Sequence, residues 1–137
     1  MNNYLGVLAV AALCVSGQQA CASAPVRQSG FKEWRTILAQ TQADTPSAEM
    51  LRILEKFVED YPQGRHVSDA RFAIAELLYK DERYAEAMPH YRFLAERRDR
   101  TFFADALLRI GEIQYNTKRF KEASETWQRL ADKISGN

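Results

Sequence analysis

The sequence predicts an all-α protein in which antiparallel helix-turn-helix pairs stack into a short α-solenoid of about three repeats. Two segments, residues 69–96 and 105–132, match along their length at a constant separation, 105 − 69 = 36 residues. Apolar residues in both segments recur at steps of three and four, which is the spacing of one helix face. The polar turns 80–83 and 116–119 divide each segment into two helices. Turns of this length join antiparallel neighbours.

The first element in chain order is a segment without charged residues, Met1–Ala24. Its apolar stretch, Tyr4–Val15, is shorter than the about 20 residues that a transmembrane helix needs. It has the length of the hydrophobic region of a secretory signal peptide. We therefore expect a signal peptide over residues 1–22, with cleavage after Ala22 preferred and cleavage after Ala24 as the second choice. Exported chains of this kind are periplasmic or secreted; the alternative is an uncleaved N-terminal membrane anchor.

Both cysteines, Cys14 and Cys21, lie in this first segment. Lipidation of Cys21 is a second alternative route to the membrane, because a small residue, Ala20, precedes it. Gln18 stands where such a signal usually has leucine. After removal of the signal peptide the mature chain has no cysteine, so neither disulfide bonds nor thiol catalysis are expected.

The repeat domain is expected to follow a linker at residues 23–30. We predict that it covers residues 31–137 and divides into three repeats, 31–64, 65–100 and 101–137.

The first repeat is a degenerate copy, with helices predicted over residues 31–40 and 47–62. Pro62 ends the second of them, because proline cannot continue a helix. Leu38 and Met50 stand at positions where the later repeats have small residues. This pair of helices is therefore expected to pack less closely than the others.

The second and third repeats each offer one small residue per helix, Ala75 and Ala87 in the second and Gly111 and Ala123 in the third. Two antiparallel helices can approach closely at such positions. A glycine inside a helix costs about 1 kcal/mol relative to alanine. Close approach to the partner helix is the expected compensation at Gly111.

The pattern resembles the signature of the tetratricopeptide repeat family. The matching residues are Trp34, Pro62, Ala87, Tyr91, Ile110-Gly111, Ala123 and Trp127. The resemblance covers Phe31–Ile134, and the stretch YPQGRHVSDARFAIAELLY is most similar to repeats of bacterial envelope proteins. It implies a right-handed solenoid and a non-catalytic adaptor that binds a protein or peptide partner of the cell envelope. The chain departs from the family in its longer period and in the absence of a proline after the second and third pairs.

The resemblance also implies a partner-binding groove, because the first helix of each pair lines the concave face in this family. The residues at those positions are Asp69, Phe72, Glu76, Tyr79, Lys80, Asp105, Leu108, Glu112, Tyr115 and Asn116. Carboxylates, hydroxyls and apolar anchors in such a row suit a segment that carries Lys or Arg and an apolar side chain. The alternative interpretation is that the tyrosines belong to the core and the acids keep the face soluble.

The C-terminal edge is the second predicted interaction surface. Repeat arrays normally finish with a polar capping helix, whereas here the third pair is followed only by Ser135-Gly136-Asn137. Trp127, Leu130 and Ile134 would leave this edge apolar. We expect self-association or docking there, and the alternative function is a structural or assembly factor that oligomerises through this edge.

Composition and the lack of known motifs argue against nucleic-acid binding, metal binding and catalysis. The formal net charge of +1 gives no basic surface for nucleic acid. His66 and His90 stand alone, without the partner spacing of a metal site. The chain has no glycine-rich phosphate loop and no nucleophile motif. The sequence therefore predicts no enzyme, no metal and no cofactor.

Overall fold

The computed structural model of the chain describes residues 30–41, 45–97 and 101–136. Six helices and no strand occupy these ranges. They are α2 (Phe31–Thr41), α3 (Ser47–Asp60), α4 (Val67–Lys80), α5 (Tyr84–Glu96), α6 (Phe103–Asn116) and α7 (Phe120–Ile134). Each helix packs on the next one in chain order. This arrangement confirms the predicted all-α solenoid of stacked helix pairs.

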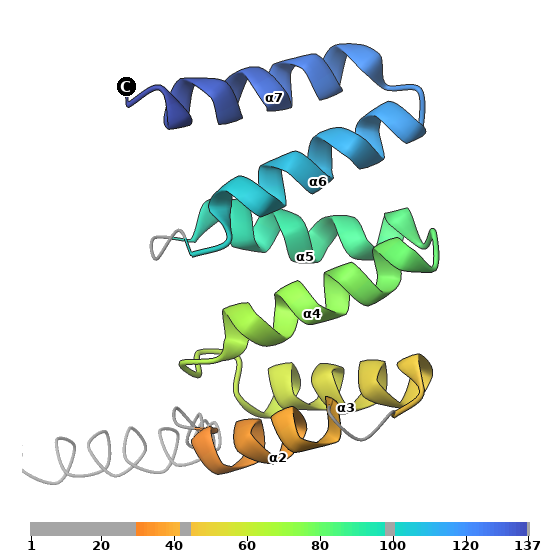
Figure 1. Ribbon diagram of the computed structural model, residues 1–137, viewed down its shortest axis with the longest axis vertical. Helices are drawn as coiled ribbons and strands as arrows, with labels where there is room; N and C mark the ends of the chain where they lie inside the picture. Colours follow the sequence, from red (N-terminus) through yellow and green to blue (C-terminus); the bar gives the residue numbers. More distant parts are fainter. Residues whose placement is uncertain (1–29, 42–44, 98–100, 137) are drawn as a thin grey trace, which may run out of the picture.

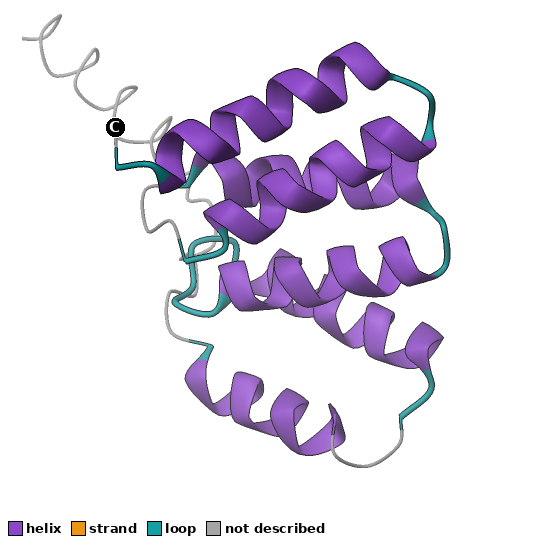
Figure 2. Ribbon diagram, turned by 45° about the horizontal axis from the view of Figure 1, so that its top comes forward, coloured by secondary structure: helices purple, strands orange, loops and turns teal. Residues whose placement is uncertain are grey.

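Figure 1 shows the helices as one stack that runs from α2 at one end to α7 at the other. The chain reverses direction at each connection, so neighbouring helices are antiparallel (Figure 2). The three pairs α2–α3, α4–α5 and α6–α7 follow one another along the stack. A stack of this kind buries the apolar side of each pair against its neighbour, which one pair alone cannot do.

The core runs along the stack and is built from the small and apolar residues of the repeats. Ala75 and Ala87, the small residues of the second pair, are fully buried. Tyr91 is the largest fully buried side chain and follows Ala87 by one helical turn. An aromatic ring therefore fills the space that the small residues leave beside them.

The close approach at Gly111 involves a side chain of the neighbouring helix. A Cβ atom built on Gly111 would overlap the indole of Trp127 in α7. The indole Nε1 donates to the backbone oxygen of Leu108 at 3.5 Å. The Trp127 side chain of α7 thus packs against α6 at the glycine where a close approach was predicted.

The turns inside the second and third pairs share one backbone conformation. Glu82 and Lys118 both adopt positive φ, 58° and 62°, and 118 − 82 gives the same repeat separation of 36. The next residue in each turn, Arg83 or Arg119, donates its N–H five residues back, at 2.9 Å and 2.8 Å. This hydrogen bond is the mark of a Schellman helix end, whose left-handed position usually holds glycine.

The first pair is more open than the others. A cavity of about 440 Å³ lies between α2 and α3, and 46% of Leu38 is exposed. Trp34 contacts Phe57, with ring centroids 5.4 Å apart. Helix α3 ends at Asp60, two residues before the predicted end, because the residue before a proline is pushed out of the helical region.

Several expectations fall on residues that the structure does not describe. They are the signal peptide 1–22 with its cleavage sites, Cys21, and the linker apart from Gly30. Within the described ranges, none of the helices has the length and apolar character needed to cross a bilayer.

Candidate functional site

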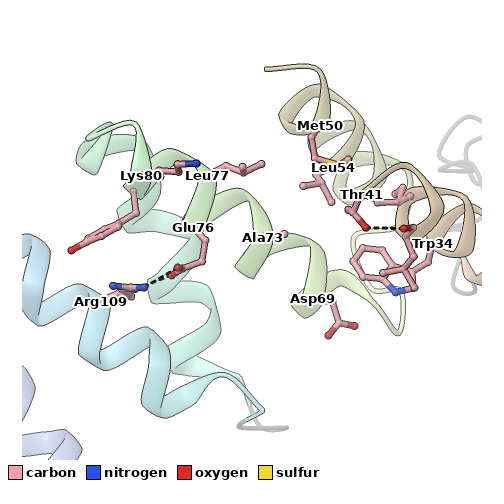
Figure 3. A pocket seen from close by; sticks show the side chains of 13 residues that line it. Trp34, Thr41, Met50, Leu54, Asp69, Ala73, Glu76, Leu77, Lys80 and Arg109 are labelled. Atoms are coloured by element: carbon pink, nitrogen blue, oxygen red, sulfur yellow. Dashed lines mark hydrogen bonds and ion pairs between the residues drawn. The ribbon is translucent and has the colours of Figure 1, made fainter. Parts of the chain in front are cut away.

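A cavity of about 670 Å³ opens where α2 and α3 meet α4, and we call it the α2–α4 cavity. Its apolar lining comes from α2, α3 and α4: Trp34, Ile37, Leu38, Met50, Leu54, Ala73 and Leu77. Its polar lining comes from α2, α4 and α6: Thr41, Asp69, Glu76, Tyr79, Lys80 and Arg109. Figure 3 shows the two helix pairs on either side of this space. An apolar cavity with a few polar groups is the usual form of a ligand site.

The cavity lies beside a position at which the repeats differ. Ala73 of α4 lines it, and Arg109 of α6 stands at the equivalent position, since 109 − 73 = 36. In the later repeat the guanidinium of Arg109 occupies the space between α4 and α6. In the earlier repeat the methyl group of Ala73 leaves the corresponding space open.

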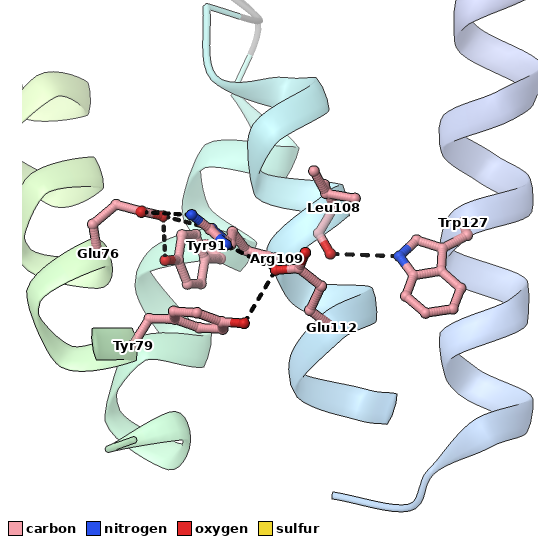
Figure 4. Close-up of polar contacts among 7 residues, drawn as sticks. All are labelled: Glu76, Tyr79, Tyr91, Leu108, Arg109, Glu112 and Trp127. Carbon is pink, nitrogen blue, oxygen red and sulfur yellow. Dashed lines mark hydrogen bonds and ion pairs between the residues drawn. The ribbon is translucent and has the colours of Figure 1, made fainter. Parts of the chain in front are cut away.

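Arg109 holds two carboxylates together at the far end of the cavity (Figure 4). Its Nε and Nη2 donate to the two carboxylate oxygens of Glu76, both at 2.9 Å. Its Nη1 donates to Glu112 at 2.9 Å. Two carboxylates share one guanidinium, so the three groups together carry an excess negative charge.

Two tyrosines complete this network. The hydroxyl of Tyr91 donates to Glu76 at 2.7 Å, and the hydroxyl of Tyr79 donates to Glu112 at 3.2 Å. The guanidinium carbon of Arg109 lies 4.6 Å from the centre of the Tyr79 ring, within cation–π range. Residues of α4, α5 and α6 are thereby joined in a single hydrogen-bonded cluster.

The environment fixes the protonation states of this cluster. Burial, and then the hydrogen bond to Glu76, raise the pKa of Tyr91 well above its ordinary value. Burial is the largest cause that raises the pKa of Tyr79, and the negative charge of Glu112 is the next. The hydrogen bond to Glu76 is the main cause that raises the pKa of Arg109. The tyrosines therefore stay protonated donors and the arginine stays charged.

The other end of the cavity carries one acid and an aromatic stack. Nδ1 of His66 lies 2.9 Å from a carboxylate oxygen of Asp69. The His66 ring stacks on Trp34, with centroids 5.2 Å apart and planes inclined by 6°. This contact ties α2 to the start of α4.

Lys80, at the last turn of α4, has no ion pair with any residue of the described ranges.

The structure places the predicted groove residues in three environments. Asp69, Glu76, Tyr79 and Lys80 line the α2–α4 cavity. Phe72 stacks on Phe102, with centroids 4.6 Å apart, and packs against the core. The others lie on α6: Asp105, Leu108, Glu112, Tyr115 and Asn116. Leu108 and Tyr115 are the large apolar residues exposed there, at 44% and 54%.

Sequence reasoning missed Arg109 and the contribution of the first repeat. Trp34, Leu38 and Met50 form the apolar side of the cavity, although the degenerate repeat gave no groove residue. One signal was available for Arg109. It is a charged residue opposite Ala73 in an alignment in which the Asp, apolar, Glu and Tyr groove positions agree in type.

The C-terminal edge is less covered than the same surface one repeat earlier. Tyr91 and Leu94 are 0% and 1% exposed. Their equivalents, Trp127 and Leu130, are half-buried, because no described helix follows α7. Ile134 is 73% exposed.

No group of three or more His, Cys, Asp or Glu side chains that could hold a metal ion occurs among the described residues.

The comparison with known families identifies one repeat. A tetratricopeptide repeat model matches residues 105–133, which comprise α6 from its third residue and nearly all of α7. No curated protein and no solved structure matches the chain. The match confirms the tetratricopeptide resemblance for the third repeat, and repeats of this type form protein-interaction surfaces. The closer similarity to bacterial envelope proteins stays a prediction.

Proposed function

We propose that this chain is a non-catalytic adaptor exported to the cell envelope, which binds a segment of a protein partner in the α2–α4 cavity. The observation that carries the proposal is the cavity itself. It lies between two repeats, is mostly apolar and has charged residues of both signs at its rim. The tetratricopeptide repeat at residues 105–133 supports protein as the class of partner.

The chemistry of the cavity indicates the partner segment that fits it. Trp34, Leu38 and Met50 offer a surface for an apolar side chain. Glu76 and Glu112 already share Arg109, so a partner cation meets only their excess negative charge. Asp69 and Lys80 lie 11 residues apart on α4, about 16 Å along a helix. We therefore expect a segment with an apolar anchor flanked by charged residues.

The sharpest test fills the cavity with the side chain that the next repeat carries. Ala73→Arg places an arginine where α6 has Arg109, in a space large enough to hold it. Ala85→Arg is the matched control, because Ala85 is an exposed alanine on α5. Ala73 is half-buried beside the core and Ala85 is exposed, so circular dichroism first establishes that both variants keep the wild-type helices.

The measurement is capture of partners from the native cell envelope with the wild-type chain and both variants, followed by identification of the captured proteins. A partner that is retained by wild type and Ala85→Arg and lost from Ala73→Arg supports the proposal. Equal capture by all three chains, with circular dichroism showing intact helices, would contradict it.

A second candidate function rests on the uncovered surface of α7. Trp127 and Leu130 are more exposed than Tyr91 and Leu94, and Ile134 is largely exposed. In this alternative the chain is a structural or assembly factor that oligomerises through the C-terminal repeat. Sedimentation equilibrium of wild type and Ile134→Lys separates the two candidates. Oligomers that dissociate in the variant favour assembly, and monomers at all concentrations exclude it.

Export is tested independently of binding. N-terminal sequencing of the protein from its own envelope fraction should find a chain that begins at Ser23, or at Pro25 for the second cleavage site. A chain that still begins at Met1 supports the membrane-anchored alternative. An acylated N-terminal Cys21 supports lipidation.

A further inference from the structure

A cluster of basic side chains surrounds one aromatic ring on the α4–α5 pair. The guanidinium carbon of Arg71, from α4, lies 4.2 Å from the centre of the Phe93 ring of α5. The guanidinium carbon of Arg97, at the end of α5, lies 5.3 Å from the same centre. His90 precedes Phe93 by one helical turn, and the charge of Arg71 helps to lower the pKa of His90. All four residues are half-buried.

Within the part of the chain that the structure describes, no acidic side chain pairs with Arg71. The Nε of Arg71 is buried without a hydrogen-bond partner. Nδ1 of His90 is also buried without a partner. Arg109, by contrast, is held by two carboxylates. A buried donor without an acceptor is costly, so these two groups mark a place where an acceptor is favoured.

The electrostatics of the two groups agree with this geometry. Burial, and then the charge of Arg97, lower the pKa of Arg71. Burial, and then the charge of Arg71, lower the pKa of His90. Like charges and partial desolvation therefore both oppose the cationic state here. An anion placed among these groups would reverse the effect of each.

The cluster is separate from the α2–α4 cavity. Asp69, Ala73 and Glu76 of α4 line that cavity. Arg71 is two residues from Asp69 and from Ala73, a rotation of about 200° around a helix. It therefore lies on the opposite side of α4, toward α5. Occupation of one site does not obstruct the other.

We infer that Arg71, His90 and Arg97, arranged around Phe93, form a binding site for an oxyanion of the phosphate class. The planar guanidinium of Arg71 is held by the aromatic ring and offers donors in the fork geometry that matches phosphate. A neutral imidazole with its proton on Nδ1 supplies a further donor. The guanidinium carbons of Arg71 and Arg97 lie 4.2 Å and 5.3 Å from the same ring centre, and two guanidinium groups suit a phosphate, which carries more negative charge than a carboxylate. The phosphate can belong to a soluble phosphate compound or to a lipid headgroup.

The test titrates inorganic phosphate into the full chain at constant ionic strength, with chloride as the balancing anion. The imidazole resonances of His90 are followed by NMR. They should shift and saturate, and the pKa of His90 should rise because the bound anion favours its charged form. His66 is the internal control, because it lies beside Trp34 of α2 and should not respond.

Arg71→Met removes the charge while keeping an apolar chain over Phe93. It should weaken phosphate binding by about tenfold or more, the loss expected for one charged hydrogen bond. Arg92→Met is the matched control, since Arg92 is an exposed arginine of α5, the helix that carries His90 and Phe93, and it should bind as wild type. If Arg71→Met does not fold, Arg71→Lys replaces it and should also bind more weakly. No saturable shift at His90, or undiminished binding by the folded Arg71 variant, overturns the site.

Vesicles distinguish the two sources of phosphate. The full chain is mixed with phosphatidylcholine vesicles, with and without phosphatidic acid. Sedimentation that requires phosphatidic acid and is lost in the Arg71 variant identifies a lipid headgroup as the ligand. Binding of inorganic phosphate without this Arg71-dependent sedimentation identifies a soluble phosphate compound. Any binding through the apolar N-terminal segment would be equal for wild type and variant.

Discussion

Arg109 and Glu76, 33 residues apart in the chain, are joined by two parallel hydrogen bonds of 2.9 Å each (Figure 4). The pair connects the first helices of two successive repeats. Tyr91 of the intervening helix donates to the same carboxylate. One glutamate thus fixes three helices relative to each other, at the end of the cavity where a partner segment is proposed to bind.

Arg109→Met should destabilise the fold by about 1–2 kcal/mol, because it leaves Glu76 and Glu112 without their shared cation. The side chains of the pair are 32% exposed, so water screens part of the loss. Urea denaturation measures the change. Arg129→Met, at an exposed position of α7, is the control. If both variants unfold at the same urea concentration, the network contributes nothing to stability.

Gly111→Ala should destabilise the protein although alanine is the better helix former. A Cβ at this position overlaps the Trp127 indole, and displacing a packed ring costs about 1–3 kcal/mol, more than the about 1 kcal/mol of helix propensity gained. The double mutant cycle with Trp127→Leu isolates this conflict. In the Trp127→Leu background the alanine should stabilise the chain. If Gly111→Ala also destabilises the Trp127→Leu variant, the steric overlap does not involve the indole.

Glu82→Gly and Lys118→Gly should each stabilise the fold by about 0.5–1 kcal/mol. Both residues have positive φ, a conformation that strains side-chain-bearing residues and suits glycine. Differential scanning calorimetry should show a higher Tm for each variant and additive increases for the two, since they lie in separate turns. Asp81→Gly, one residue earlier with φ −84, is the control and should lower the Tm.

Stability should fall on acidification, because the folded chain disfavours protonated His90. Burial and Arg71 lower its pKa in the fold, whereas the unfolded chain binds the proton near the ordinary value of about 6.5. The contribution is therefore fully present above about pH 6.5 and is lost as the pH falls below it. Thermal unfolding of wild type and His90→Gln between neutral pH and about pH 5 measures this. The variant should lose less stability; equal losses would show that His90 plays no part.

Much of the fold could be predicted from the sequence because repeats and helices leave local signals. The offset between Tyr91 and Trp127 identified the repeats, and the helix ends fall within a few residues of the predicted ones. The turn conformation at Glu82 and Lys118 was not predicted, since neither residue is the glycine that normally indicates it.

The candidate site could be predicted only in part. Asp69, Glu76, Tyr79 and Lys80 were expected to share a face, because the tetratricopeptide resemblance assigns the first helix of each pair to the groove. Arg109 binds both Glu76 and Glu112, and this contact depends on the distance between α4 and α6. The periodicity of a sequence carries no information about such a distance.

The sequence by itself determined that this chain is a stack of helix pairs, because the spacing of apolar residues selects helices and their repetition selects stacking. Only the tertiary structure decided which charges cancel and where space remains. Arg109 meets Glu76 because α4 and α6 both pack on α5, and the cavity lies beside Ala73, where the next repeat has Arg109. Such outcomes depend on contacts between residues far apart in the chain, and these form only when the helices pack.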